Sequence, residues 1–237
     1  QAGMANCIIA GGAESMSSVP MTGFKPELNY NTINSGHADY YWGMGNTAEA
    51  VANQFNISRE DQDEFAYKSH VKALKALSEN RFQDQIAPIK VEETYLDSSG
   101  KKVNRNYEVT KDEGPRKGTS ISALSKLRAV FANNGSVTAG NSSQMSDGAA
   151  FVMVMSEEMV KELNIEPIAR MVNYAAAGVE PKIMGIGPVA ASNKALERAG
   201  LKMSDMDVIE LNEAFAAQSL AVIKDLNIDQ SKLNIDG

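Results

Sequence analysis

Residues 207–226 read DVIELNEAFAAQSLAVIKDL and decide the fold class of this chain. Asp207–Leu211 has the apolar content of a buried strand, and Glu213–Leu226 has the length and composition of a helix. The same order occurs twice upstream, because a strand at Ala149–Met155 precedes one helix and a strand at Pro167–Ala177 precedes another. Strands that alternate with helices in this way predict an α/β fold.

Caps and turns predict the boundaries of the other elements. Ser58, with Asp61 three residues later, predicts the start of a helix that runs to about Leu77. Ser156 predicts the start of a second helix, and Gly200 the end of a third. Pro188 lies in the first turn of the third helix. The shorter predicted elements are a buried strand at Asn6–Ala10 ended by Gly11-Gly12, a loop from Ser17 to about Thr47, a helix at Thr47–Phe55, a hairpin within 86–110 that turns at Ser98-Ser99-Gly100, and a helix near Ser122–Arg128.

Composition excludes several classes of protein. The 237 residues are 43% hydrophobic and 22% charged, which suits a folded chain with a real core. The net charge of −7 argues against nucleic acid as the main partner, and no apolar stretch is long enough for a membrane span. A single cysteine, Cys7, excludes an internal disulfide framework and favours a reducing, cytoplasmic location.

Neither the cysteine nor the histidines have a setting typical of catalysis. Cys7 falls inside a predicted strand, so we expect it to be a small buried hydrophobe. His70 falls in the apolar arc of the predicted helix after Ser58, which favours a packed, hydrogen-bonded histidine. His37 lies in the long loop, away from any nucleophile motif, and no Cys/His spacing typical of a metal site occurs.

One segment departs from the acidic average. Between Lys101 and Arg128 there are eight basic and three acidic residues, a net charge of +5. Such a segment can bind a small polyanion such as a nucleotide phosphate, but on charge alone a solvated basic face is the simpler interpretation.

Four motifs in order along the chain carry a family resemblance. They are AGGAESMS at 10–17, VTAGNSS at 137–143 with SDGAA at 146–150, MGIGP at 184–188 and NEAFAAQ at 212–218. Each resembles a motif of the thiolases, and the similarity covers essentially the whole chain, including Gly43-Met44-Gly45 and Lys126-Leu127-Arg128. The resemblance implies a layered αβαβα architecture of two similar halves with a loop region inserted in the first. Residues 1–16 and 140–163 would belong to the N-terminal half, 17–139 to the inserted loop domain that binds coenzyme A, and 164–237 to the start of the C-terminal half.

The resemblance also implies the reaction. Thiolases transfer an acyl group reversibly between coenzyme A and an acyl-CoA, and they make or break a carbon–carbon bond. A nucleophilic cysteine, a histidine in a GHP motif and a second cysteine carry the chemistry. In the family the first lies upstream of the AGG segment, and the others follow the turn that Asn234-Ile235-Asp236-Gly237 resembles. We therefore expect this chain to be an internal piece of a thiolase that is inactive alone.

Among the residues present, Asn212 matches a catalytic position of the family. There an asparagine holds a water that hydrogen-bonds the thioester oxygen, which gains charge in the transition state. The alternative is that Asn212 only caps the following helix. The resemblance assigns coenzyme A or acyl-CoA contacts to Arg116 at the nucleotide end, to Ser143 at the pantetheine arm, to Leu127, Val130, Phe131, Ala139 and Met145 around both, and to Met44, Met184 and Phe215 at the reactive end.

Gly43 bears on the substrate. Biosynthetic acetoacetyl-CoA thiolases tend to have a histidine before the methionine, so glycine favours the degradative 3-ketoacyl-CoA type of fatty-acid β-oxidation, as does Asp112-Glu113-Gly114-Pro115-Arg116. The alternatives are an acetoacetyl-CoA thiolase, a noncatalytic coenzyme A-binding remnant, and an assembly partner without a ligand. Coenzyme A and acyl-CoA would be substrates rather than a permanently bound cofactor, and the complete enzyme is expected to be a homodimer or homotetramer.

Overall fold

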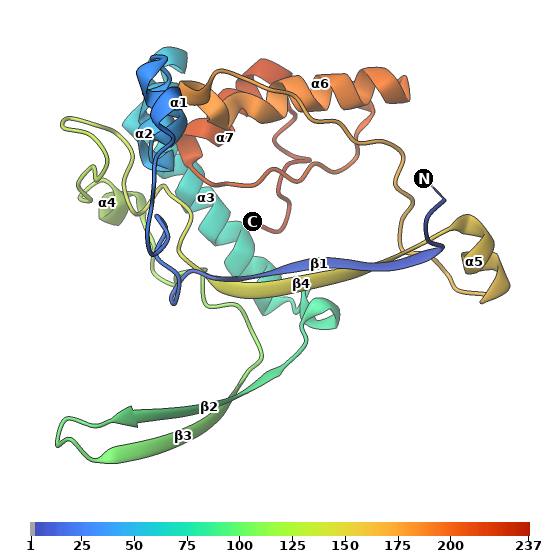
Figure 1. Ribbon diagram of the computed structural model, residues 1–237, viewed down its shortest axis with the longest axis horizontal. Coiled ribbons are helices and arrows are strands. Elements are labelled where there is room, and N and C mark those ends of the chain that lie inside the picture. Colours follow the sequence, from blue (N-terminus) through green and yellow to red (C-terminus); the bar gives the residue numbers. More distant parts are fainter. Residues whose placement is uncertain (1–2) are drawn as a thin grey trace.

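The computed structural model describes residues 3–237, and its elements form a mixed α/β arrangement (Figure 1). Gln1 and Ala2, the first two residues of the predicted N-terminal half, lie outside the described residues. The strands are β1 (Cys7–Ser15), β2 (Ile89–Leu96), β3 (Lys102–Val109) and β4 (Asp147–Met155). The helices are α1 (Tyr30–Asn34), α2 (Met44–Phe55), α3 (Arg59–Ser78), α4 (Ile121–Leu124), α5 (Glu157–Glu162), α6 (Gly187–Ala199) and α7 (Ala216–Leu226), with 3₁₀ turns at Ala38–Tyr41, Gln83–Gln85, Pro181–Ile186 and Met203–Asp205. None of the described helices is long and apolar enough to cross a membrane.

The core gathers around α7, which packs against α2, α3 and α6 (Figure 1). Val222, Ile223 and Leu226 form a buried cluster with residues that follow the helix, and Phe65 of α3 packs against it. Small residues on the other side of α7 let its neighbours approach closely, since Ala221 is completely buried against Val51 of α2. Burial of apolar surface in this helical layer is the main stabilising term of the described fold.

Several predicted helix boundaries are confirmed, but α1 lies in the segment from Ser17 to about Thr47 predicted as a loop, and α4 ends at Leu124, before the predicted end near Arg128. The Ser58 side chain accepts a hydrogen bond from the Asp61 amide at 3.0 Å and caps α3. Ser156 caps α5 in the same way through the Met159 amide. Pro188 lies in the first turn of α6, and Gly200 ends that helix in the left-handed conformation at φ 68°.

The predicted hairpin is confirmed as the antiparallel pair β2–β3, which projects away from the helices (Figure 1). Its register pairs Ile89 with Val109 and Leu96 with Lys102. The Asp97 carboxylate fixes the turn, because it accepts hydrogen bonds from the amides of Ser99 and Lys101 at 2.8 and 3.0 Å.

The strands predicted at Asn6–Ala10 and Ala149–Met155 do form, but the prediction that they are buried is wrong. Strand β1 pairs with β4 over its full length, but Ile9 is 68% exposed and Val152 is 64% exposed. Both strands are apolar, yet Figure 1 shows the two-stranded ribbon running beside the helical layer rather than between layers. Cys7, expected to be buried, is exposed for the same reason, and β1 continues through Gly11 and Gly12 instead of turning there.

Two further predictions are corrected. No strand forms at Pro167–Ala177, where the described chain pairs with no other segment. Asp207–Leu211 makes only an isolated parallel bridge between Ile209 and Leu233. A strand needs a partner ladder as well as an apolar sequence, and these segments have none here. The last helix begins at Ala216 rather than at residue 213.

Replacement of Leu226 by Ala should test the core around α7. Leu226 is 8% exposed, so we expect the change to lower the free energy of unfolding by about 2–5 kcal/mol. Urea denaturation of the chain measures this. The matched control is Leu163→Ala, because Leu163 is 51% exposed and its loss should cost less than about 0.5 kcal/mol. Equal losses for the two variants would contradict the assigned core.

Asp147 should give stability a component that depends on pH. Hydrogen bonds from the Ser17 hydroxyl and amide lower the pKa of the Asp147 carboxyl below its ordinary value of 3.8. A carboxyl whose pKa is lower in the folded state stabilises the fold above the unfolded pKa, and this contribution is lost as pH falls through the folded pKa. The difference in unfolding free energy between wild type and Asp147→Asn should therefore shrink as pH falls from about 5 to about 2. A difference that stays constant over this range, measured by urea denaturation, would refute it.

Candidate functional site

A large open cleft of about 1380 Å³ lies beside α3. One wall is a face of that helix with Phe65, His70 and Ala73. The base of the β2–β3 hairpin and residues 111–116 form a second wall, and residues 140–149 form a third. Residues 210–213 and the C-terminal turn complete it. Segments from most of the chain therefore meet at one concavity, which is the usual setting of a binding site.

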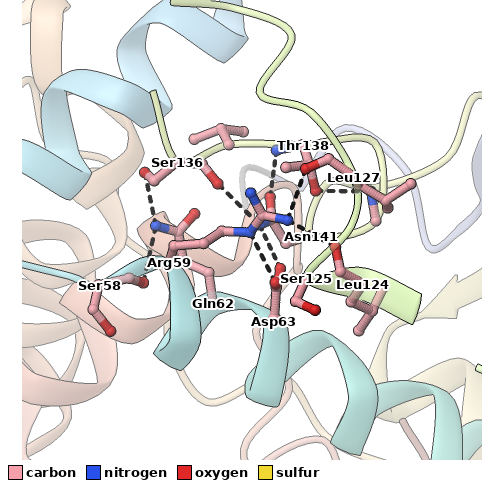
Figure 2. Close-up of polar contacts among 12 residues, drawn as sticks. Ser58, Arg59, Gln62, Asp63, Leu124, Ser125, Leu127, Ser136, Thr138 and Asn141 are labelled. Carbon is pink, nitrogen blue, oxygen red and sulfur yellow. Dashed lines mark hydrogen bonds and ion pairs between the residues drawn. The ribbon is translucent and has the colours of Figure 1, made fainter. Parts of the chain in front are cut away.

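The 136–143 segment is held by a buried polar network under the cleft (Figure 2). Asn141 is 2% exposed, and its Nδ2 donates to the Asp63 carboxylate at 3.0 Å and to the Ser136 carbonyl at 3.1 Å. Its Oδ1 accepts a hydrogen bond from the Thr138 amide at 2.7 Å. The side chain thus satisfies three backbone or side-chain groups, and it folds this segment into one fixed loop.

Arg59 neutralises Asp63 and ties α4 to the same network (Figure 2). Its Nε donates to Asp63 at 2.8 Å, and its Nη2 donates to the carbonyls of Leu124 and Leu127 at 2.7 and 3.0 Å. Asp63 is 2% exposed, and burial of a carboxylate is costly unless it is paired with a cation and hydrogen-bonded. The ion pair therefore fixes the end of α4 where the 136–143 loop packs.

Glu49 of α2 supports the beginning of the same loop. Its carboxylate accepts hydrogen bonds from the amides of Ser136 and Val137 at 3.0 and 2.9 Å and from the Ser136 hydroxyl at 3.2 Å. Glycine is required at position 135, because a Cβ atom there would collide with the Glu49 carboxylate. Two buried acidic residues, Glu49 of α2 and Asp63 of α3, thus hold the 136–143 loop in place.

Asn234 holds the opposite wall of the cleft. Its Oδ1 accepts from the Leu211 amide at 2.8 Å, and its Nδ2 donates to the Leu211 carbonyl at 2.9 Å and to Glu213 at 2.7 Å. Lys72 of α3 holds this asparagine in turn, because its Nζ donates to the Leu233 and Asn234 carbonyls at 2.8 and 3.1 Å. The residues on both sides of Asn212 are therefore fixed.

Asn212 itself lies exposed on the cleft wall. Among the residues that the structure describes, none forms a hydrogen bond with its side-chain amide, which is free to bind a ligand or a water. The alternative that Asn212 caps the next helix is wrong, because α7 begins at Ala216 with Phe215 at the N-cap position. The position of the amide in the cleft suits a polar donor for a substrate oxygen.

Backbone hydrogen bonds join the two walls directly. The Ser143 amide donates to the Ala214 carbonyl at 3.0 Å, and the Ala216 amide donates to the Asn141 carbonyl at 2.9 Å. Ser143 and Asn212 therefore belong to one connected backbone unit, although they are far apart in sequence. Gln144 continues this wall toward residues 111–116, where its side chain packs against the backbone of Gly114.

The ten predicted ligand contacts divide into three groups. Arg116, Ser143 and Met145 line the cleft together with Asn212. Phe131 and Phe215 instead pack edge to face at a centroid distance of 6.0 Å, with Phe131 also against the backbone of Gly45. The remaining residues lie outside the cleft lining, with largely exposed side chains: Met44, Leu127, Val130, Ala139 and Met184. Their roles in ligand binding stay predictions.

His70 lines the cleft, and sequence reasoning gave it only a packing role. It is half-buried, and its Nδ1 accepts a hydrogen bond from the Arg116 amide at 3.3 Å. Burial lowers the pKa of His70 below its ordinary value of 6.5, the charge of Arg116 lowers it further, and Glu213 acts in the opposite direction. The imidazole is therefore neutral at pH 7. The sequence could have indicated that His70 lines the cleft, because His70 lies on the same helical face as Ala66 and Ala73.

Other candidate chemistry lies elsewhere. Cys7 and His37 are exposed and do not line the cleft. Over residues 3–237, no three His, Cys, Asp or Glu side chains gather closely enough to hold a metal ion.

Family models and known proteins match the chain over nearly its whole length. Residues 1–158 match the model described as "Thiolase, N-terminal domain", and residues 165–237 match "Thiolase, C-terminal domain". A 3-ketoacyl-CoA thiolase of Bacillus subtilis is 47% identical over 229 residues, which cover 97% of this chain and 58% of that protein. An acetyl-CoA acetyltransferase of Pseudomonas aeruginosa is 43% identical over 246 residues, which cover 99% of this chain and 61% of that protein.

Solved structures agree with these matches. The dimeric peroxisomal thiolase of Saccharomyces cerevisiae has a TM-score of 0.87 at 39% identity, over 99% of this chain and 58% of that one. The human mitochondrial 3-ketoacyl-CoA thiolase has a TM-score of 0.82 at 38% identity, over 98% and 59%. The predicted mixed α/β fold is thereby confirmed. The chain spans about three fifths of the length of these relatives, from 58% to 61%.

Replacement of Asn141 by Ala should loosen the cleft wall. The change leaves Asp63 Oδ1, the Ser136 carbonyl and the Thr138 amide without their partner in a buried setting, although Arg59 still binds Asp63 Oδ2. We expect the unfolding free energy to fall by about 2–4 kcal/mol. Urea denaturation measures the loss. Asn173→Ala is the control because, within residues 3–237, the Asn173 side chain hydrogen-bonds only the amide of its neighbour, Tyr174. An Asn141→Ala variant as stable as wild type would contradict the role given to this network.

Proposed function

The chain belongs to the thiolase family, and we propose that the protein of which it forms a part cleaves 3-ketoacyl-CoA with coenzyme A in fatty-acid β-oxidation. The products would be acetyl-CoA and an acyl-CoA shortened by two carbons. The observation that carries the proposal is the convergence of Arg116, Ser143, Met145 and Asn212 on one cleft. A cation suits the phosphates of coenzyme A, and a hydroxyl and an amide suit its pantetheine arm and thioester.

In the proposed reaction a thiolate attacks the keto carbon of the substrate. The bond between this keto carbon and the methylene carbon that separates it from the thioester then breaks. The electron pair passes to acetyl-CoA as an enolate, which takes up a proton. Coenzyme A then attacks the enzyme-bound thioester and leaves as the shortened acyl-CoA. Asn212 would hold a water that donates a hydrogen bond to the thioester oxygen as it gains charge, and its fixed neighbours keep this donor in place.

The cysteine and histidine chemistry of this reaction is proposed to come from outside the 237 residues. Cys7 lies on the exposed β1–β4 ribbon and does not line the cleft. His70 holds a backbone amide with one ring nitrogen. The chain alone should therefore bind coenzyme A without catalysing thiolysis.

Two further features concern specificity and assembly. Gly43, at the N-cap of α2, favours the degradative 3-ketoacyl-CoA type over the acetoacetyl-CoA type. The relatives carry both kinds of name, so the ratio of turnover on long and short 3-ketoacyl-CoA decides between them. The yeast relative is dimeric, and we propose a homodimer or homotetramer for the complete protein, which sedimentation would test.

The complete protein with Asn212→Ala tests the proposed catalytic step. We expect kcat for thiolysis of a long-chain 3-ketoacyl-CoA to fall by about 10²–10³, because one donor to the developing oxyanion is lost. Asn193→Ala, on an exposed part of α6, is the control and should keep wild-type kcat. An unchanged kcat in Asn212→Ala would remove Asn212 from the mechanism. Thiolysis by the purified 237-residue chain would refute the proposal that its catalytic groups lie elsewhere.

A further inference from the structure

The segment 111–118, called the Arg116 loop below, lines the cleft through residues 111–116 and contacts both α3 and Gln144. Its link to α3 is the hydrogen bond from the Arg116 amide to His70 Nδ1 at 3.3 Å. Among the described residues, this is the one hydrogen bond that joins the loop to another element. On its other side the loop touches the Gln144 side chain through Gly114.

The backbone at Arg116 is also fixed from within the loop. The Thr119 hydroxyl and amide both donate to the Arg116 carbonyl, at 3.0 and 3.4 Å. Gly118 closes this turn at φ +84°, a conformation that other residues rarely adopt. The turn alone would leave the loop free to swing as a unit, and the contact with His70 sets where it lies in the cleft.

The contact requires a neutral imidazole. A neutral ring that accepts at Nδ1 carries its proton on Nε2, whereas a protonated ring has donors at both nitrogens and can accept no hydrogen bond. Protonation would also place a second positive charge beside Arg116. The pKa of His70 lies below 6.5 because of burial and Arg116, so the contact persists through neutral pH and is lost below it.

Other charged groups of the cleft bear on this titration. Glu213 favours the protonated ring. The remaining titratable side chains that line the same cleft are Tyr107, Lys111, Asp112, Glu113, Asp147, Glu210 and Asp236. The phosphates of the proposed ligand would attract a protonated His70 electrostatically, and this attraction opposes the loss of affinity that release of the loop is expected to cause.

We propose that His70 is a positioning residue, whose neutral imidazole holds the Arg116 loop where it can bind the phosphates of coenzyme A and whose protonation releases the loop. This rests on the proposed coenzyme A binding in the cleft. His70 acts through the Arg116 backbone and has no contact with reacting atoms. The affinity for coenzyme A should therefore be constant above neutral pH and should fall as His70 takes up its proton.

Calorimetric titration of the 237-residue chain with coenzyme A tests this across pH 8 to about 5. The affinity of wild type should fall by about three- to tenfold more than that of His70→Asn, whose Oδ1 can accept the same hydrogen bond without titrating. His70→Ala should bind about three- to tenfold more weakly than wild type at about pH 7.5 and lose the same pH-dependent component. His37→Asn is the matched control and should follow wild type, because His37 is exposed and outside the cleft.

The ligand needs its own control, since the 3′-phosphate monoester of coenzyme A titrates near pH 6, at about the second pKa of a phosphate ester. Dephospho-coenzyme A lacks this group, and the difference between wild type and His70→Asn should remain with it. Identical pH profiles for wild type and His70→Asn would overturn the inference while the proposed coenzyme A site stands.

A second measurement does not depend on ligand. In the free chain, the amide resonance of Arg116 should shift with the same midpoint as the His70 ring, and it should not titrate in His70→Asn. An Arg116 amide whose chemical shift does not change as His70 titrates would overturn the inference. Absence of coenzyme A binding by wild type at about pH 7.5, with the Arg116 shift intact, would instead count against the proposed function alone.

Discussion

The buried carboxylate of Asp63 is the group on which the site depends. It lies in the helical layer at 2% exposure, and it accepts hydrogen bonds from Arg59 on its own helix and from Asn141 in the distant loop. A carboxylate removed from water is tolerated only when paired and hydrogen-bonded, so the requirement to satisfy Asp63 fixes the loop. That loop then carries Ser143 and, through two backbone hydrogen bonds, meets the segment that contains Asn212.

Helix α3 applies the same principle along its length. Arg59 and Asp63 hold the 136–143 loop near its first turns, His70 holds the Arg116 amide in the middle, and Lys72 holds the C-terminal turn that carries Asn234. Arg59, His70 and Lys72 satisfy backbone groups directly, and Asp63 acts on the loop through the Asn141 side chain. Irregular segments have no ladder to satisfy their own polar groups, so a rigid helix with suitable side chains is an effective scaffold for them.

The exposed β1–β4 ribbon shows that the apolar pattern of the sequence predicted burial wrongly. Its strands are continuous apolar runs, which indicate burial on both faces, yet residues such as Ile9 and Val152 are largely exposed in the described structure. The segments at 167–177 and 207–211 were predicted as strands from the same kind of pattern, and they form no ladder. Apolar content indicates that burial of a segment is favourable. Whether the segment pairs as a strand depends on which other segments lie beside it.

The sequence by itself determined the family, the hairpin and most of the longer helices, whereas α1 lies in a segment that it predicted as a loop. Ser58, Ser156 and Gly200 fixed helix ends through bonds and angles within a few residues, and the Ser98-Ser99-Gly100 turn fixed the hairpin in the same local way. Only the tertiary structure decided which residues share the cleft, that Asn212 does not cap α7, and that His70 holds the Arg116 loop. The physical reason is distance along the chain: these contacts join residues 46, 78 and 161 positions apart, and no local preference records them.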